Sequence, residues 1–154
     1  MPDAVAMATD SELAAELFQR SAVAYAALMQ GDIDRHAALM RFADDFTVMS
    51  PFGGEPTRGM TPERLAALGR FFANGNLEME LVQAYASSDL VVLAVIERTH
   101  VEVGGLPAQD WALRVTLVYR REGRDWRLAH RHADPLANGI SLAEAAALGR
   151  GETA

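Results

Sequence analysis

The beginning of the chain has the apolar spacing of an amphipathic helix. Four apolar residues recur at intervals that place them on one helical face: Leu13, Leu17, Ala24 and Leu28. Thr9 and Glu12 have the spacing of a capping box, and Gly31 is a residue type that commonly follows a helix end. The pattern therefore predicts a long helix from Thr9 to Gln30.

Two shorter helices are predicted before residue 77. Asp32 is placed to cap a helix that runs to about Phe42. Another helix begins at Thr61–Pro62, because proline is favoured in the first turn, and Asn74–Gly75 ends it. Between these two helices, residues 46–50 are predicted as a strand that the following proline halts.

From residue 77 onward the pattern changes to strand-like runs separated by short turn signals. Four such runs are predicted: Leu77–Ala86, Leu90–Val103, Gln109–Arg121 and Trp126–Asp134. Short turns between consecutive strands imply an antiparallel meander, and strands this long must twist and curl. We therefore predict an α+β fold in which a curved sheet wraps on the N-terminal helices and leaves a cavity.

The length of the chain favours one domain. A chain of 154 residues, half of them apolar, can build one hydrophobic core but is too short to build two stable ones. We divide it into a flexible N-terminal tail over residues 1–9, a domain over residues 10–135 and a C-terminal extension over residues 136–154. Within the extension, the Ala-rich stretch from Ser141 to Leu148 favours a short helix.

Charge and composition narrow the choice of partners. With 14 basic and 21 acidic residues, the formal net charge of −7 repels phosphate backbones and anionic lipid surfaces. The sequence has no cysteine, which excludes disulfides, thiolate metal sites and thiol nucleophiles. Neither a membrane-spanning stretch nor a signal peptide is apparent. We therefore expect a cytoplasmic protein that binds neither nucleic acid nor membrane.

Two parts of the chain resemble known families. Residues 25–32 (YAALMQGD) and 42–59 (FADDFTVMSPFGGEPTRG) are similar to the N-terminal half of bacterial ketosteroid isomerases. Residues 120–132 (RREGRDWRLAHRH) resemble the closing hairpin of SnoaL-like proteins and of the calcium/calmodulin-dependent kinase II association domain. These families share the cone-shaped fold of the nuclear-transport-factor-2-like (NTF2-like) superfamily. The resemblance implies that function lies in a pocket beneath the curved sheet.

The isomerase chemistry does not carry over. The general-base aspartate of that family would fall at Ser50, and its oxyanion-hole tyrosine would fall at Ala24. Tyr25 is one place along, about 100° around the helix. The second aspartic acid of the family belongs in the third long strand, where residues 112–121 contain none. A serine hydroxyl cannot shuttle a carbon-bound proton without a base of its own, so steroid isomerase activity is not expected.

Strand alternation and the resemblance together suggest which residues line the pocket. The pocket arginines of the kinase association domain align with Glu97 and Thr116, and Arg114 matches an arginine common in SnoaL-like proteins. We therefore predict that Glu97, Arg114 and Thr116 share the pocket face. Glu97 and Arg114 would form either a core salt bridge or a ligand-facing pair of general base and anion-binding arginine. The other predicted ligand-binding residues are Tyr25, Met49, Ser50 and Phe52.

Two histidines are the best acid–base candidates, because imidazole titrates near neutral pH. His130 and His132 stand two residues apart in the last strand, and alternation from Trp126 places both on the pocket side. Some metal sites use this spacing with a third ligand, for which the candidates are Glu97, His100, Asp110 and Asp134. No metal and no other cofactor is predicted. His36 is expected to face solvent.

Two functions of different class follow. The first is a cofactor-free isomerase, cyclase or dehydratase that acts by acid–base chemistry on an apolar oxygenated small molecule. In it, Glu97, His130 and His132 would be catalytic and Arg114 would bind the ligand. The second is a non-catalytic ligand-binding or dimerisation module. In either case we expect a homodimer through the sheet, since the alternating apolar residues on its exposed side need cover.

Overall fold

The structure is a computed structural model that describes residues 9–152. Helix α1 (Asp10–Met29) begins at Thr9, whose hydroxyl oxygen accepts a hydrogen bond from the backbone N–H of Glu12 at 3.1 Å. All four apolar positions of the predicted stripe are buried, so the amphipathic pattern identifies the face that α1 turns to the sheet. The predicted N-terminal tail, apart from Thr9, lies outside the described residues.

Helix α2 (Ile33–Leu39) begins at the predicted cap and ends earlier than predicted. Asp32 accepts a hydrogen bond from the backbone N–H three residues later, at 3.1 Å. Met40 then adopts an extended backbone that leads directly into strand β1 (Phe42–Met49). The prediction that this helix reaches Phe42 is therefore wrong, because Phe42 pairs with Leu128 of the sheet.

Helix α3 (Pro62–Gly69) begins at the predicted cap Thr61 and is also shorter than predicted. It ends before residue 74 because strand β3 (Phe72–Ala86) already begins at Phe72. The strand pairing shifts after residue 73, and Asn74 has a left-handed backbone with φ of 53°. Asn74 therefore marks an irregularity within a strand, and the prediction that it ends a helix is wrong.

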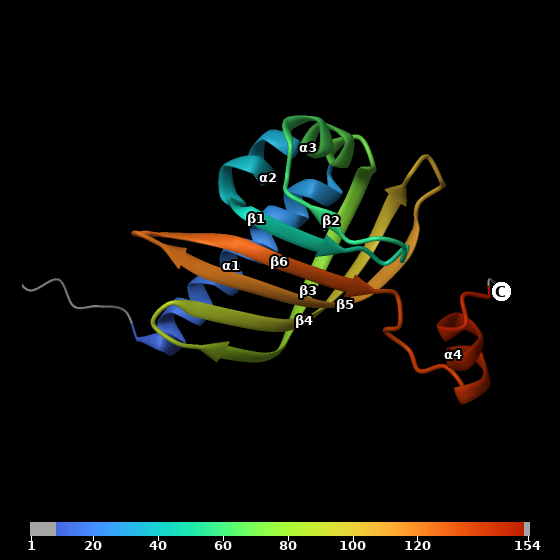
Figure 1. Cartoon of the computed structure of the whole chain (residues 1–154). Coiled ribbons are helices and arrows are strands. Elements are labelled where there is room, and N and C mark those ends of the chain that lie inside the picture. Colours follow the sequence, from blue (N-terminus) through green and yellow to red (C-terminus); the bar gives the residue numbers. More distant parts are fainter. Residues whose placement is uncertain (1–8, 153–154) are drawn as a thin grey trace, which may run out of the picture.

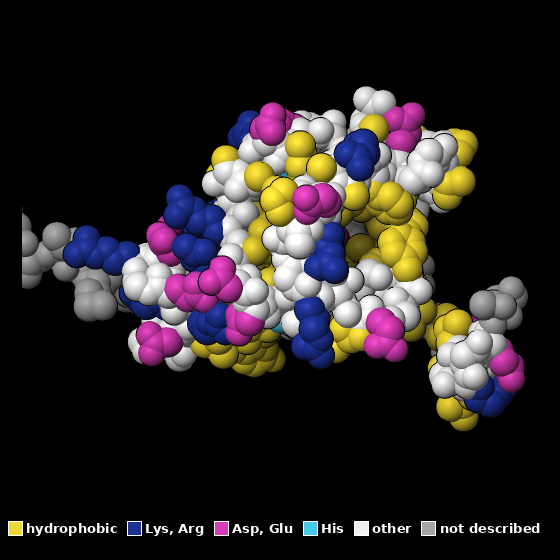
Figure 2. Space-filling model, turned by 45° about the horizontal axis from the view of Figure 1, so that its top comes forward, with side chains coloured by type: hydrophobic (Ala, Val, Ile, Leu, Met, Phe, Trp, Pro, Cys, Tyr) yellow, Lys and Arg dark blue, Asp and Glu magenta, His cyan; other side chains and the backbone are white. Residues whose placement is uncertain are grey.

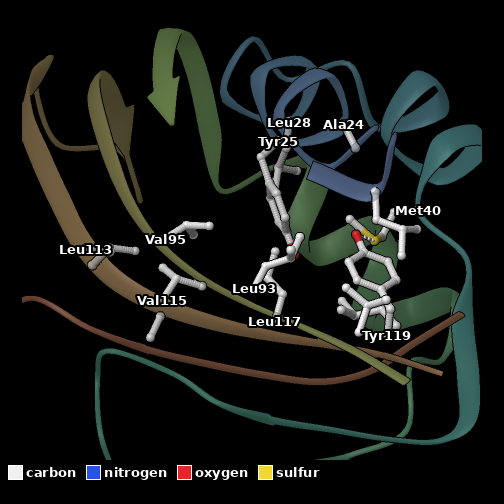
Figure 3. Packing of buried hydrophobic residues seen from close by; sticks show 14 of the residues in the cluster. Ala24, Tyr25, Leu28, Met40, Leu93, Val95, Leu113, Val115, Leu117 and Tyr119 are labelled. Carbon is white, nitrogen blue, oxygen red and sulfur yellow. Dashed lines mark hydrogen bonds between the residues drawn. The ribbon is translucent and has the colours of Figure 1, made fainter. Parts of the chain in front are cut away.

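Six strands form one curved sheet in the order β2-β1-β6-β5-β4-β3. The strands not yet named are β2 (Thr57–Arg58), β4 (Leu90–Val103), β5 (Gln109–Glu122) and β6 (Asp125–Asp134). Strands β3 to β6 form the predicted antiparallel meander, and β1 pairs parallel to β6. Figures 1 and 3 show the N-terminal helices on the concave side of the sheet. The predicted α+β architecture is confirmed.

The core lies between α1 and the concave face of the sheet. Tyr25 and Leu28 point from α1 toward the curved strands, where Leu93, Leu117 and Tyr119 face them (Figure 3). All five side chains are buried in one cluster. Because successive strand residues alternate between faces, this cluster also identifies which residues of β4 and β5 point inward.

A β-bulge in β6 decides which of its side chains point inward. The pairing with β5 shifts by one residue at Ala129. Before the bulge Leu128 is buried, and after it Arg131 points inward while His130 and His132 turn to the outer face. One extra residue inverts the alternation, so the prediction that both histidines share the inner side with Leu128 is wrong.

The C-terminal helix α4 (Leu142–Gly149) lies where the Ala-rich stretch predicts a short helix. Ser141 and Glu144 form a reciprocal capping box at its start. Figure 1 shows α4 standing apart from the sheet and from the other helices. Within residues 9–152, no helix is long and apolar enough to cross a membrane.

Candidate functional site

A cavity of about 210 Å³ lies between the helices and the concave face of the sheet. Figure 2 shows a hollow rimmed largely by hydrophobic side chains. The apolar lining consists of Leu28, Met29, Phe42, Phe46, Val48, Pro51, Phe52, Met60, Leu68, Phe71, Phe72, Trp111 and Leu113. The polar lining residues are Tyr25, His36, Ser50, Glu97, Thr99 and Arg131. An apolar cavity with a few polar groups is the usual form of a small-molecule site.

Glu97 and Arg131 form a buried ion pair in the cavity wall. Nη1 of Arg131 donates to Oε2 of Glu97, and Nη2 donates to Oε1, both at 2.9 Å. The Glu97 side chain is 5% exposed and that of Arg131 is 16% exposed. This two-bond geometry gives each carboxylate oxygen a donor and leaves the pair without net charge.

Tyr25 lies against the guanidinium of Arg131. The guanidinium carbon is 4.5 Å from the centroid of the Tyr25 ring, within range of a cation–π contact. Burial raises the pKa of Tyr25 well above its ordinary value, and the opposing effect of the Arg131 charge is smaller, so the phenol stays protonated. Burial, the largest single effect, lowers the pKa of Arg131, but the effects of Glu97 and Tyr25 together outweigh it and the pKa is raised.

His36 enters the cavity wall from α2, and the prediction that it faces solvent is wrong. The residue is 1% exposed, and its Nδ1 lies 2.8 Å from the carbonyl oxygen of Ala24 in α1. Its ring centroid is 5.4 Å from that of Tyr25. Burial lowers the pKa of His36 below its ordinary value of 6.5; the bond to Ala24 opposes this, and the Arg131 charge adds to it. The imidazole is therefore neutral near pH 7.

Four of the residues predicted for the site line the cavity: Tyr25, Ser50, Phe52 and Glu97. Phe52 comes from the loop after β1 and is 65% exposed, which places it at the rim. Its ring lies 5.8 Å from that of Phe71 and 5.9 Å from that of Trp111, centroid to centroid. Met49, at the end of β1, is exposed and is not part of the lining.

Arg114 and Thr116 lie on the outer face of the sheet. The strand register pairs Glu97 with Leu113, so Leu113 is the β5 residue beside Glu97 on the inner face. Arg114 is 54% exposed and donates to the two carboxylate oxygens of Asp134 at 3.1 and 3.3 Å. The prediction that Arg114 and Thr116 share a face with Glu97 is wrong. The pairing of β4 with β5 differs by one residue from the pairing that the prediction needs, so Leu113 stands beside Glu97.

His130 and His132 also lie outside the cavity. Nδ1 of His130 is 2.8 Å from the hydroxyl oxygen of Thr47 in β1, and the two imidazole centroids are 6.4 Å apart. Among the described residues, no three His, Cys, Asp or Glu side chains gather in a way that could hold a metal ion. The structure therefore does not bring Glu97, His130 and His132 together.

Three polar residues that line the cavity are absent from the predicted site: Arg131, His36 and Thr99. No local signal in the sequence marks the bulge at Ala129 that turns Arg131 inward. His36 does carry a signal, because it stands three residues after Ile33 and four before Met40, and both of these pack on the core. Counting helical positions places His36 among apolar side chains.

Comparisons with known proteins agree with this architecture. The SnoaL-like domain family profile matches residues 19–137. No curated protein is similar enough to this chain to count as a match. One similar solved structure is a candidate calcium/calmodulin-dependent protein kinase type II association domain from Thiobacillus denitrificans. It is 25% identical to this chain with a TM-score of 0.60, and the match covers 76% of this chain and 92% of that one. A candidate dehydratase of the NTF2-like family from Streptomyces avermitilis is 18% identical with a TM-score of 0.68, over 84% and 100% of the two chains.

The matched region contains the whole candidate site. It runs from within α1 to just beyond β6 and includes every residue that lines the cavity, from Tyr25 to Arg131. Both solved structures match the fold of this chain over most of their own length. The chain therefore belongs to the SnoaL-like domain family, within the NTF2-like superfamily.

Proposed function

We propose that the cavity binds a compact, uncharged and largely apolar small molecule. The observation that carries this proposal is the pairing of Glu97 with Arg131, which leaves a mostly aromatic and aliphatic cavity without net charge. Sites for drug-sized ligands usually measure roughly 300–1,000 Å³. At about 210 Å³, this cavity suits a single ring or a short chain.

The ion pair also selects against charged ligands. A ligand carboxylate would compete with Glu97 for the donors of Arg131, and the loser would be a buried anion without a partner. Such an unpaired buried charge costs several kcal/mol. A ligand cation would compete with Arg131 for the oxygens of Glu97, and the loser would be a buried cation without a partner. Neutral ligands avoid both penalties.

Binding fits the geometry better than acid–base catalysis by the predicted set of Glu97, His130 and His132. Glu97 lines the cavity, but each of its oxygens already accepts from Arg131. His130 and His132 lie on the other face of the sheet. The predicted catalytic set thus supplies no free base to a bound molecule. The dehydratase-like neighbour, at 18% identity, supports the fold alone.

Calorimetry with two matched probes tests the proposal. We expect p-xylene to bind and to raise Tm, and 4-methylbenzoate, which carries the same ring and a carboxylate, to bind at least about tenfold more weakly at pH 7. The cavity-filling variant Leu113→Trp should lose p-xylene binding. Leu148→Trp, the same enlargement on the exposed face of α4, should keep it. Absence of p-xylene binding to the unmodified protein, or preference for the carboxylate, contradicts the proposal.

We further propose that two copies associate through the outer face of the sheet. Cross-strand pairing places Tyr85 beside Val92, and Val92 beside Val118, which gives an apolar strip across β3, β4 and β5. Tyr85 is 62% exposed in the single chain. A contact between two such strips buries apolar side chains that a monomer leaves in water. The similarity to an association domain supports this reading.

Sedimentation velocity tests the association. We expect the unmodified protein to sediment as a dimer and Val92→Glu, which puts a charge in the strip, as a monomer at the same concentration. Leu142→Glu adds the same charge on α4, where Leu142 is exposed, and should leave the dimer intact. A monomeric unmodified protein at micromolar concentration, or a dimer that survives Val92→Glu, contradicts the proposal.

A further inference from the structure

His36 has a second ring nitrogen that is available to a ligand. Its Nδ1 lies 2.8 Å from the carbonyl oxygen of Ala24, and a carbonyl oxygen only accepts, so Nδ1 carries the proton. The neutral imidazole has one proton, and Nε2 therefore has a free lone pair. Burial keeps the ring neutral by lowering its pKa. The result is a hydrogen-bond acceptor at the wall of a mostly apolar cavity.

The groups around His36 leave this acceptor without a donor. Among residues 9–152, none donates to Nε2. The terminal nitrogens of Arg131 donate to Glu97, and the hydroxyl of Thr99 donates to the carbonyl oxygen of Trp111 at 2.7 Å. Tyr25, the other titratable neighbour, packs against His36 through its ring. Among the described residues, Nε2 is not one of the fully buried nitrogen and oxygen atoms that lack a hydrogen-bond partner, so it stays accessible, and the cavity that His36 lines is the side from which a donor can arrive.

We propose that the ligand of this cavity carries one neutral hydrogen-bond donor, an O–H or N–H group, and that Nε2 of His36 accepts from it. The inference rests on the proposed binding function and deepens it. The apolar walls provide affinity for a compact molecule, and His36 provides selectivity. Phenols, enols and small alcohols belong to the favoured class. Ethers and hydrocarbons of the same size do not, because they offer no proton to the lone pair.

Three probes of one shape separate these contributions. They are p-cresol with a hydroxyl donor, 4-methylanisole with the same oxygen but no donor, and p-xylene with neither. The variant His36→Asn retains an amide N–H that can reach the Ala24 carbonyl oxygen, and it removes the Nε2 acceptor. His100→Asn is the control, because His100 lies on the outer face, where its Nδ1 is 2.9 Å from Asp110.

We expect the unmodified protein to bind p-cresol about three- to tenfold more tightly than 4-methylanisole, the range of one neutral hydrogen bond. His36→Asn should abolish that ratio with little change in p-xylene affinity, and His100→Asn should preserve it. A preference for p-cresol that survives His36→Asn overturns the role of His36 while p-xylene binding still supports the proposed function. If none of the three probes binds the unmodified protein, both proposals are overturned.

A measurement on the unmodified protein covers the case in which His36→Asn does not fold. In protein labelled with ¹⁵N at histidine, the unprotonated Nε2 of His36 has a nitrogen resonance well separated from that of a protonated ring nitrogen. We expect p-cresol to move this resonance in the direction of hydrogen bonding and p-xylene to leave it close to its starting position. Equal movement with both probes, or none with saturating p-cresol, overturns the inference.

Discussion

Arg131 of β6 reaches across the intervening strand β5 to place its two terminal nitrogens 2.9 Å from the two carboxylate oxygens of Glu97 in β4. The partners of these residues on β5 are Leu117 and Leu113, so the pair lies over an apolar surface. It joins two strands that share no backbone hydrogen bonds. The same contact removes net charge from the cavity, so stability and ligand preference depend on one pair.

Removing one member of the pair should destabilise the protein more than removing both. Arg131→Met leaves the Glu97 carboxylate buried without a partner, and we expect the free energy of unfolding to fall by about 3–5 kcal/mol. The double variant Glu97→Leu/Arg131→Met buries no charge and should be more stable than Arg131→Met. Urea unfolding followed by circular dichroism measures both.

The exposed pair of Arg114 and Asp134 provides the control for this experiment. Arg114→Met breaks an ion pair in which the arginine is half-exposed, so the expected loss is about 0–1 kcal/mol. A double variant at Glu97 and Arg131 that is no more stable than Arg131→Met would contradict the argument. It would mean that lost packing, and not the orphaned charge, dominates.

His36 should make the protein less stable in mild acid. Its pKa in the folded state lies below the 6.5 of the unfolded state, because burial disfavours the imidazolium, so below about pH 6.5 the unfolded chain binds a proton that the folded chain does not. This group therefore contributes stability above pH 6.5, which is lost as the pH falls, with a slope of up to about 1.4 kcal/mol per pH unit.

Urea unfolding between pH 5 and pH 7.5 measures the contribution of His36 as the difference in stability between the unmodified protein and His36→Asn at each pH. The stability of the unmodified protein should fall more steeply toward acid than that of His36→Asn, which cannot titrate there. His100→Asn, which changes an exposed histidine paired with Asp110, should retain the steep fall. Parallel pH profiles for the unmodified protein and His36→Asn would show that the buried imidazole takes up its proton as readily as an exposed one.

Much of the fold is readable from the sequence because its signals are local. The caps at Thr9, Asp32 and Thr61 and the turns between the four long strands each depend on a few neighbouring residues. Helix ends are less readable. The chain after α3 joins the sheet at Phe72, where pairing with Val103 of β4 outweighs a local preference for helix.

The candidate site is less readable because it depends on register between strands. Glu97 is correctly placed on the inner face, yet its predicted partner Arg114 is one residue away from the position that faces it. The bulge at Ala129 then exchanges His130 for Arg131 on the inner face of β6. Alternation within a strand is a local property, but the offset between strands is set by turns and bulges.

The link between Ser21 and Tyr119 should show an asymmetric cost of mutation. The Tyr119 hydroxyl lies 2.5 Å from Oγ of Ser21, which donates its own proton to the carbonyl oxygen of Leu17 at 2.7 Å. Ser21→Ala leaves the buried phenol with only the weak acceptor Met40, and we expect a loss of about 1–3 kcal/mol. Tyr119→Phe leaves Ser21 bonded to Leu17 and should cost less.

Thermal and urea unfolding of the two single variants and the double variant check this asymmetry. Ser21→Ala/Tyr119→Phe removes both hydroxyls, so its stability should be close to that of Tyr119→Phe alone. The two single variants could instead lose equal stability, and the loss in the double variant could equal their sum. That outcome would indicate that the two hydroxyls contribute independently. Such a result would contradict the linked hydrogen bonds.

Gly75 allows β3 to approach both β4 and α1 closely, and a methyl group there should be destabilising. An added Cβ would lie 2.5 Å from Cγ2 of Val101 and 3.0 Å from the backbone oxygen of Met29. Val101 is fully buried and cannot move aside, so Gly75→Ala should cost about 1–3 kcal/mol. In a Val101→Gly background both clashing side-chain atoms, Cγ2 at 2.5 Å and Cβ at 2.6 Å, are absent, and the same substitution should cost less. Gly139→Ala, where an added Cβ has no neighbour within 4 Å, should change stability by less than about 0.5 kcal/mol. An equal cost for Gly75→Ala in both backgrounds would rule out the clash with Val101 as its cause.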